Sequence, residues 1–332
     1  MKVSLIMLSL VGCLAAGTLP SEQRRNGPLL REVLSPVQKA FQESSAVFYD
    51  LKTRKYFIYG TVMSADGYIL TKSSELPEAG EFSVRIGKEH YREAEVVGRD
   101  AHWDLALVKV NAEGLLPPVW KGKDGEGEIQ RATWVVSNGA TARRSRRVRP
   151  GVISANRRPI EGPTLTALGL ALSEEGEEVI IGGVAENSGA KEAELEEKDV
   201  ILAVDGQTIK NREDLLQILE SKVPGDQVLL RIRRGDQELE KEVELKARGE
   251  VFEEQLDRND QMSGEFSRRR TNFPMVIQHD TTSSRRNMGG PLLLLDGTAV
   301  GMNIACANRV ETYAIPAKEL LEVYQRMLKA AQ

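Results

Sequence analysis

The sequence predicts a mainly β protein with two folded parts. Its first half holds short apolar runs, partly β-branched, separated by turn pairs such as Asp66-Gly67. This pattern is typical of an all-β barrel. The length of 332 residues suggests two domains rather than one. The strands expected in the first barrel are Ala46–Tyr49, Tyr56–Met63, Tyr68–Thr71, Phe82–Ile86, Glu93–Val97 and Leu105–Val110.

Residues 1–19 are expected to be an export signal rather than part of the fold. A short apolar run from Val3 to Ala16 follows Lys2, and it is too short for a membrane-spanning helix. Leu10–Cys13 also fits a lipoprotein cleavage box, in which Cys13 would carry the lipid. The alternatives are ordinary cleavage near Ala16 and a cytoplasmic protein with an apolar start. The expected location is the periplasm or cell envelope, with a lipid anchor at Cys13 as one form of it.

Helical periodicity occurs near both ends of the remaining chain. Apolar residues of Leu29–Phe41 recur at helical spacing, which indicates a short helix leading into the barrel. Ala317–Ala331 shows the same spacing and predicts a C-terminal helix.

Composition excludes little. The chain is 41% hydrophobic and 28% charged, and its net charge of -4 is too small to indicate a partner. Cys13 is removed or lipidated in either export reading, so Cys306 has no partner for an intrachain disulfide. We expect Cys306 to be a small buried residue. No ligand cluster predicts a metal site, and no cofactor is expected.

Three segments carry a specific resemblance. Asn287–Leu292 reads Asn-Met-Gly-Gly-Pro-Leu and is followed by a strand, the turn Asp296-Gly297 and a strand ending in Asn303. It resembles the nucleophile loop of HtrA/DegP-type serine proteases, Gly-Asn-Ser-Gly-Gly-Pro-Leu. Gly60–Ser74 resembles the segment that delivers the catalytic histidine, and Gly98–Val110 resembles the segment with the catalytic aspartate.

The resemblance implies an incomplete catalytic triad. Asp104 falls on the aspartate, but Ser74 stands at the histidine position and Met288 at the serine position. Arg286 replaces the glycine that begins the oxyanion loop, in which Asn287 and Gly289 are kept. A thioether cannot be deprotonated to attack a carbonyl, and a serine hydroxyl is no base near neutral pH. The catalytic set is therefore not intact, and Asp104 is its only remnant.

The resemblance also implies the fold: a chymotrypsin-like double β-barrel with a PDZ domain inserted in the second barrel and a C-terminal helix. Thr133–Ser137 and Gly151–Ser154 resemble strands that begin the second barrel, and Pro274–Asp280 and Tyr313–Pro316 resemble strands that complete it. Insertion is physically easy where the termini of a module lie close together. The expected parts are 1–19 signal peptide, 44–156 first barrel and start of the second, 165–246 PDZ domain, 247–272 linker, and 273–332 remainder of the second barrel with the helix. Arg157–Thr166 is expected to be a linker before the insert.

The PDZ-like segment predicts a peptide groove. Ala167–Leu172 resembles the carboxylate-binding loop and its strand, where a Cβ on the glycine would obstruct the converging backbone N–H groups. Asn211–Lys222 predicts the groove helix, with Asn211 as its N-cap. Glu194 and Lys198 replace family glycines and are expected to strain turns that favour positive φ. The residues expected to bind peptide are Leu168, Gly169, Leu170, Leu172, Leu215 and Leu219. A PDZ domain that only packs internally is the alternative.

Two further features suggest other functions. His102 and Asp104 are two apart and would face one side of a strand, and Ser283 and Ser284 precede the loop, so a relocated triad is conceivable. Arginines cluster in two stretches that family analogy places on loops around the vacated site, where they could bind an acidic partner or remain solvated. They lack interleaved aromatic residues, so nucleic acid is not expected. The arginines are Arg143, Arg144, Arg146, Arg147, Arg149, Arg157 and Arg158, then Arg268, Arg269, Arg270, Arg285 and Arg286.

These observations favour an exported HtrA-like protein that binds protein C-termini or extended peptides in a scaffolding or regulatory role. One alternative is an active serine endopeptidase of envelope quality control with displaced catalytic groups. Another is a structural subunit that forms homo-oligomers or assembles with active family members.

Overall fold

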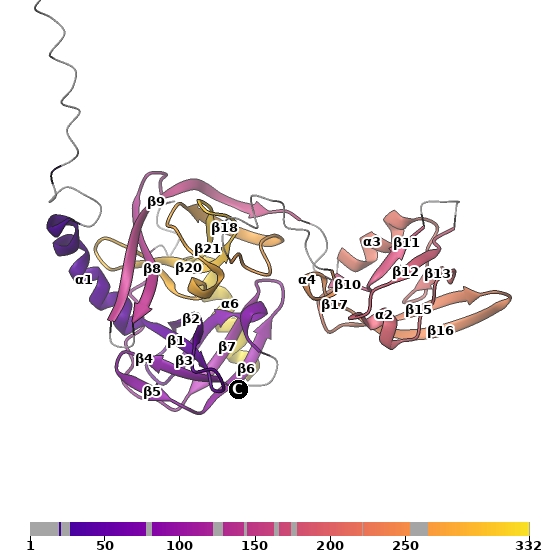
Figure 1. Cartoon of the computed structure of the whole chain (residues 1–332), viewed down its shortest axis with the longest axis horizontal. Coiled ribbons are helices and arrows are strands. Elements are labelled where there is room, and N and C mark those ends of the chain that lie inside the picture. Colours follow the sequence, from indigo (N-terminus) through magenta and orange to yellow (C-terminus); the bar gives the residue numbers. More distant parts are fainter. Residues whose placement is uncertain are drawn as a thin grey trace, which may run out of the picture.

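The computed structural model describes residues 20, 27–77, 82–121, 129–142, 145–162, 166–173, 178–220, 222–252 and 265–331. The expected export signal and Cys13 lie outside these residues, as do Arg143 and Arg144. The described chain is mainly β and contains two barrel-like halves and a PDZ-type module (Figure 1).

The first half is a seven-stranded antiparallel sheet in the order β5-β4-β1-β2-β3-β7-β6, and no closing pair is found among its described residues. Gly67 turns β2 into β3 at φ +105°, and a Cβ there would lie 2.2 Å from the Val110 carbonyl oxygen. The sequence predicted six of the strands to within a few residues and missed β5. The bounds are β1 Ser45–Asp50, β2 Tyr56–Val62, β3 Tyr68–Lys72, β4 Phe82–Ile86, β5 Glu89–Tyr91, β6 Ala94–Asp100 and β7 Leu105–Val110.

The second half is a closed six-stranded barrel in the order β18-β21-β20-β19-β8-β9. Strand β9 is much longer than the expected Gly151–Ser154, and it includes Arg157–Ile160 of the expected linker because Ile160 pairs with Phe273 and Arg158 with Val276. The bounds are β8 Trp134–Ala142, β9 Ser145–Ile160, β18 Phe273–His279, β19 Pro291–Leu294, β20 Ala299–Cys306 and β21 Thr312–Pro316.

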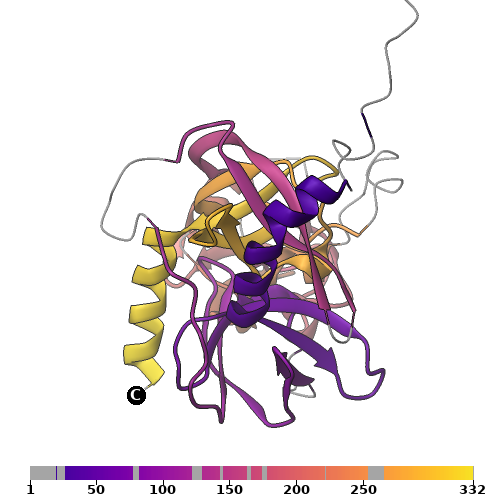
Figure 2. The same ribbon diagram turned by 90° about the vertical axis from the view of Figure 1, so that its left-hand side faces the viewer.

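Two helices cover the barrels on different sides (Figure 2). Helix α1, Pro28–Ser44, buries Leu34, Val37 and Phe41, whose spacing places them on one face. Helix α6, Ala317–Ala331, begins and ends where the sequence predicted and packs into the main core cluster. That cluster joins Leu70 and Leu107 of the first half to residues of the second, so the two halves pack through a shared apolar cluster.

The PDZ module lies in the chain between β9 and β18, with barrel strands before and after it, and Figure 1 shows it to one side of the barrels. Its ends are adjacent because Thr166 pairs with Ala247 and Ala167 with Lys246. It has its own apolar core, which includes Leu195, Leu230 and Val243. Its strands are β10 Thr166–Ala167, β11 Leu170–Leu172, β12 Ile181–Val184, β13 Val200–Val204, β14 Gln207–Thr208, β15 Gln227–Arg234, β16 Gln237–Glu244 and β17 Lys246–Ala247; its helices are α2 Gly189–Glu192, α3 Arg212–Glu220 and α4 Arg248–Val251.

Local signals in the PDZ segment are found as predicted. The Asn211 side-chain oxygen accepts a hydrogen bond of 2.9 Å from the Asp214 N–H and caps helix α3. Glu194 and Lys198 both adopt positive φ, at 57° and 74°, as the missing glycines implied. The expected linker 247–272 contains helix α4 within its described part.

Candidate functional site

Asp104 and Ser74 meet as the resemblance implied for the aspartate and the residue at the histidine position. Asp104 is buried in the turn before β7, and its Oδ1 accepts a 2.7 Å hydrogen bond from the Ser74 N–H. The Ser74 hydroxyl donates to Oδ2 over 2.9 Å. The aspartate therefore still orients residue 74, but that residue offers a hydroxyl where an acid–base catalyst would need an imidazole.

Lys72 also binds the Asp104 carboxylate. Its side chain is 0% exposed, and its ammonium group forms a salt bridge with Asp104 Oδ2. Lys72 Nζ also donates to the Arg269 carbonyl over 3.1 Å. Burial lowers the pKa of Lys72, while the negative charges of Asp104 and Glu75 act in the opposite direction. A buried ion pair of this kind ties strand β3 to the turn that holds the aspartate, and removal of one partner alone typically costs about 3–5 kcal/mol.

Sequence reasoning missed Lys72 as part of the site. A lysine in a strand is normally taken to be solvent-exposed, and nothing local to Thr71-Lys72-Ser73 indicates a buried partner. The available signal was its position two residues before Ser74, on the strand already matched to the histidine segment. Arg269 was assigned to an arginine cluster, but burial lowers its pKa and it donates to the carbonyls of Ala101 and His102.

Met288 is fully buried in the loop before β19. Its carbonyl accepts a 3.0 Å hydrogen bond from the Tyr59 N–H, and the Gly289 N–H donates to the Asn303 carbonyl over 2.7 Å. Gly289 adopts φ +86°, and a Cβ there would lie 2.0 Å from the Tyr59 carbonyl oxygen. These contacts explain why the glycine is kept although the reacting serine is absent.

The loop before Met288 is wound into a short 3₁₀ turn, Arg285–Asn287. The Met288 N–H donates to the Arg285 carbonyl over 3.1 Å, and the Asn287 N–H donates to the Ser284 carbonyl over 2.9 Å. An oxyanion hole requires backbone N–H groups that point at the substrate oxygen. In this structure the N–H of the residue at the nucleophile position is already bonded within its own turn.

Arg286 differs from the expectation based on the missing glycine. It is not among the described residues with positive φ, because it lies inside the 3₁₀ turn. Its guanidinium also does not project freely across the loop, since Nε lies 2.8 Å and Nη2 2.9 Å from the two oxygens of Glu265. Arg286 is thus held to the segment that returns from the PDZ module.

No alternative triad is assembled from the described histidines. His102 lies in the turn 101–104 rather than on a strand, so the expected shared strand face with Asp104 does not exist. His279 is fully buried, with Nε2 2.8 Å from Asn303 Oδ1. His90 Nε2 lies 3.0 Å from the Ser83 hydroxyl, but Ser83 is 2% exposed and has no room for a substrate.

Most of the described arginines in the two clusters have partners within the chain. Arg157 and Arg158 lie on strand β9 rather than on a loop. Arg157 pairs with Glu319 on α6, and the Arg158 guanidinium donates to the Gln278 side-chain oxygen. Arg149 donates to the Thr282 carbonyl over 2.7 Å. The predicted acidic partner is therefore left with fewer free cations than the sequence suggested.

The six residues expected to bind peptide line one groove of about 330 Å³. Leu168 to Leu172 form one wall, and Leu215 and Leu219 of helix α3 form the other. Gly169 has φ +86°, and a Cβ there would lie 2.0 Å from Ser188 Cβ. Close packing against Ser188 therefore requires a glycine here. The sequence did not identify Arg212, Arg248 and Phe252, which also line the groove.

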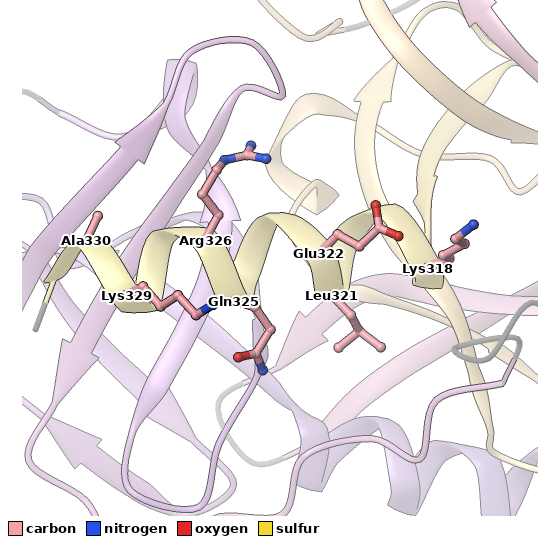
Figure 3. A pocket seen from close by; sticks show the side chains of 7 residues that line it. All are labelled: Lys318, Leu321, Glu322, Gln325, Arg326, Lys329 and Ala330. Atoms are coloured by element: carbon pink, nitrogen blue, oxygen red, sulfur yellow. The ribbon is translucent and has the colours of Figure 1, made fainter.

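A shallow hollow also lies on the outer face of α6, lined by Lys318, Leu321, Glu322 and other helix residues (Figure 3). None of its lining residues is among those matched to the triad. Among the described residues, no cluster of three or more metal-ligating side chains occurs. In the same part of the chain, no helix is long and apolar enough to cross a bilayer.

Comparison with known sequences defines the class. Residues 59–202 match the trypsin-like peptidase domain family, and residues 166–245 match the PDZ domain family. The first match overruns the second because residues 166–202 belong to the PDZ module, where the chain has left the barrel. The fold and both matches define a trypsin-like protein with a PDZ domain.

Relatives place it more closely. A probable periplasmic serine endoprotease DegP-like of Ectopseudomonas mendocina (strain ymp) is 36% identical over 99 residues, which are 30% of this chain and 20% of that protein. One of Pseudomonas putida (strain GB-1) is 32% identical over 105 residues, or 32% of this chain and 21% of that protein. The chain thus matches about a fifth of the length of these relatives. Over about a third of its own length it is similar to these DegP-like proteins.

Solved structures of similar proteins are more distant. An inactive mutant form of Rv3671c from M. tuberculosis H37Rv has 15% identity and a TM-score of 0.48, with 90% of this chain and 92% of that chain covered. The serine endoprotease from Yersinia pestis has 16% identity and a TM-score of 0.37, with 64% of this chain and 97% of that chain covered.

Proposed function

We propose that this chain is an exported HtrA-like protein that lacks serine-protease activity and binds protein C-termini or extended peptides through its PDZ groove. Its role is then scaffolding or regulatory. The observation that carries the proposal is the salt bridge between buried Lys72 and Asp104, beside Ser74. The carboxylate that would orient a catalytic base instead neutralises a lysine.

The residue at the nucleophile position and the loop before it support the same conclusion. Acyl transfer needs a nucleophile, a base and an oxyanion hole in mutual reach. Met288 supplies a buried thioether, and its N–H is bonded within the 3₁₀ turn. Loss of the triad leaves at most about 10³–10⁴-fold rate enhancement over water even where an oxyanion hole is intact.

The test has two arms that use the purified full chain. We expect no cleavage of casein or of a fluorogenic peptide library, and no labelling by a fluorophosphonate probe. We expect a labelled peptide with a free apolar C-terminus to bind and to be released by Leu170→Glu, which places a charge beside the groove. Probe labelling at any serine would overturn the first arm, and unchanged binding by the variant would overturn the second.

The finer assignments are part of this proposal. The names of the relatives refer to the periplasm, which supports export of this chain, and lipidation at Cys13 is one form of it. We also propose the division into 44–156, 165–246, 247–272 and 273–332. Assembly into homo-oligomers or with active family members, and an acidic partner at the arginines, stay predictions that co-purification from cell envelopes can test.

A further inference from the structure

The PDZ groove has a defined direction. Strand β11 pairs with β12 alone among the described residues, so its other edge faces the groove and can accept an added peptide strand. The carboxylate-binding loop 168–170 lies at the start of β11. A peptide that ends at this loop and pairs antiparallel with β11 therefore runs its preceding residues toward Leu172.

Helix α3 runs alongside in a known orientation. The Thr166 hydroxyl donates a 3.2 Å hydrogen bond to the Leu219 carbonyl, so the C-terminal end of the helix lies near the carboxylate loop. Arg212, the first residue of α3, therefore lies at the far end of the groove. Seven residues of helix span roughly 10 Å, which equals about three residues of extended peptide.

A second arginine marks the opposite end. Thr166 pairs with Ala247, so helix α4, which begins at Arg248, lies at the Leu219 end of the groove. A Cβ on Gly169 would lie 3.1 Å from Val251 Cγ1, so this helix packs against the carboxylate loop, and Arg248 lines the same groove. Both arginines are exposed, and within the described residues neither has an ion-pair partner. Arg248 lies over the Phe252 ring at 5.2 Å, which directs its guanidinium along that wall of the groove.

The floor between the two cations is apolar. Leu168, Leu215 and Leu219 are each at most 5% exposed. The groove thus presents an apolar pocket with a cation at the carboxylate end and a second cation about three peptide residues upstream. A free C-terminus supplies one anion for this pattern, and an acidic side chain supplies the other.

We propose that this groove selects protein C-termini that end in an apolar residue and carry Asp or Glu about three residues before it. The inference rests on the proposed peptide-binding function and adds its specificity. Arg248 reinforces recognition of the terminal carboxylate, and Arg212 pairs with the upstream acid. Because Arg212 is exposed, its pair contributes selectivity of a few-fold rather than most of the affinity.

Fluorescence anisotropy with the full chain tests the selectivity. The probes are labelled peptides that end in leucine and differ only at the third residue before it, which is Glu, Gln or Lys. We expect the Glu peptide to bind about threefold to tenfold more tightly than the Gln peptide, and the Lys peptide to bind most weakly. The preference should shrink as salt is raised, because the pair is screened.

Charge reversal supplies the matched control. Arg212→Glu should reverse the order so that the Lys peptide binds best, whereas Arg231→Glu, an exposed change on β15 outside the groove, should keep the wild-type order. Equal Kd values for the three peptides with the wild type would overturn the specificity.

A C-terminally amidated Glu peptide should bind much more weakly than the same peptide with a free carboxylate. This loss of affinity should be larger for the wild type than for Arg248→Gln. If the amidated peptide binds as well as the free acid, the proposed C-terminal recognition itself fails.

Discussion

Lys72 decides what the carboxylate of Asp104 can do. In a working triad that carboxylate is hydrogen-bonded to histidine and stabilises its charged form. Here the lysine ammonium supplies the compensating charge without a histidine, and the Ser74 hydroxyl completes the carboxylate's hydrogen bonds. The site therefore contains a buried ion pair, and removal of only one of its two charged residues is costly.

This arrangement predicts that catalysis is not restored by two substitutions. Ser74→His with Met288→Ser should cleave a fluorogenic peptide only slowly, because Lys72 still holds Asp104 and the 3₁₀ turn still uses the N–H of residue 288. Addition of Lys72→Asn and Arg286→Gly should raise hydrolysis by at least about tenfold, within the range of one oxyanion donor. Asp104→Asn added to this quadruple variant is the control and should abolish the gain. A double variant that cleaves as fast as the quadruple variant would show that neither Lys72 nor Arg286 is an obstacle.

His279 predicts a pH dependence of stability. Burial lowers the pKa of His279 from 6.5 to about 4, while its hydrogen bond to Asn303 and the charge of Asp280 act in the opposite direction. Between these values the unfolded chain binds a proton that the folded chain does not. The free energy of unfolding therefore falls as the pH drops through this window, by about 2 kcal/mol between pH 7.5 and 5.

Urea unfolding at the two pH values measures this effect. His279→Gln should flatten the dependence, whereas His102→Gln, an exposed change, should leave it as in the wild type. If His279→Gln keeps the full slope, other groups carry the acid sensitivity.

At the scale of elements, local signals predicted both terminal helices and the strands of the first half except β5. Where the sequence failed, the cause was a distant partner. Arg157–Ile160 looks like a polar linker, but it is strand because it pairs with β18, which follows the whole PDZ module. The burial of Lys72 likewise depends on Asp104, in the turn before β7. The family pattern located the site, but only tertiary contacts showed how its empty positions were filled.

The turn at Lys198 predicts a stabilising substitution. Lys198 adopts φ 74° in the turn before β13, a conformation that costs a non-glycine residue roughly 1 kcal/mol. Its side chain is exposed, so little contact is lost on truncation. Lys198→Gly should raise the free energy of PDZ unfolding by about 0.5–1 kcal/mol. Lys198→Ala is the matched control, since it removes the side chain and keeps the strain. Equal stabilities of the two variants in urea would show that the turn is not strained.

At the scale of the whole molecule, the PDZ module interrupts a barrel that is complete without it. The six strands of the second barrel come from both sides of the insert, and the shared apolar cluster joins Phe273 after it to Leu70 and Leu107 before it. The groove and the rebuilt triad site are therefore carried by separate cores. A loss of chemistry in one core does not require a loss of binding in the other.

This organisation predicts that the module can be excised. Thr166 and Ala247 are antiparallel partners, so a two-residue Gly-Ser link in place of residues 166–247 should close the gap without strain. The return segment that carries Glu265 and Arg269 would be kept, and with it their contacts to Arg286 and Lys72. We expect the shortened chain to stay soluble, to unfold cooperatively in urea, and to lose binding of the leucine-terminated peptide. A matched variant with the same Gly-Ser pair in place of only Gly235 and Asp236, in the β15–β16 turn, should retain the module and its binding. A shortened chain that shows no cooperative transition would mean that the barrel needs the PDZ module to fold, and that the two cores are not independent.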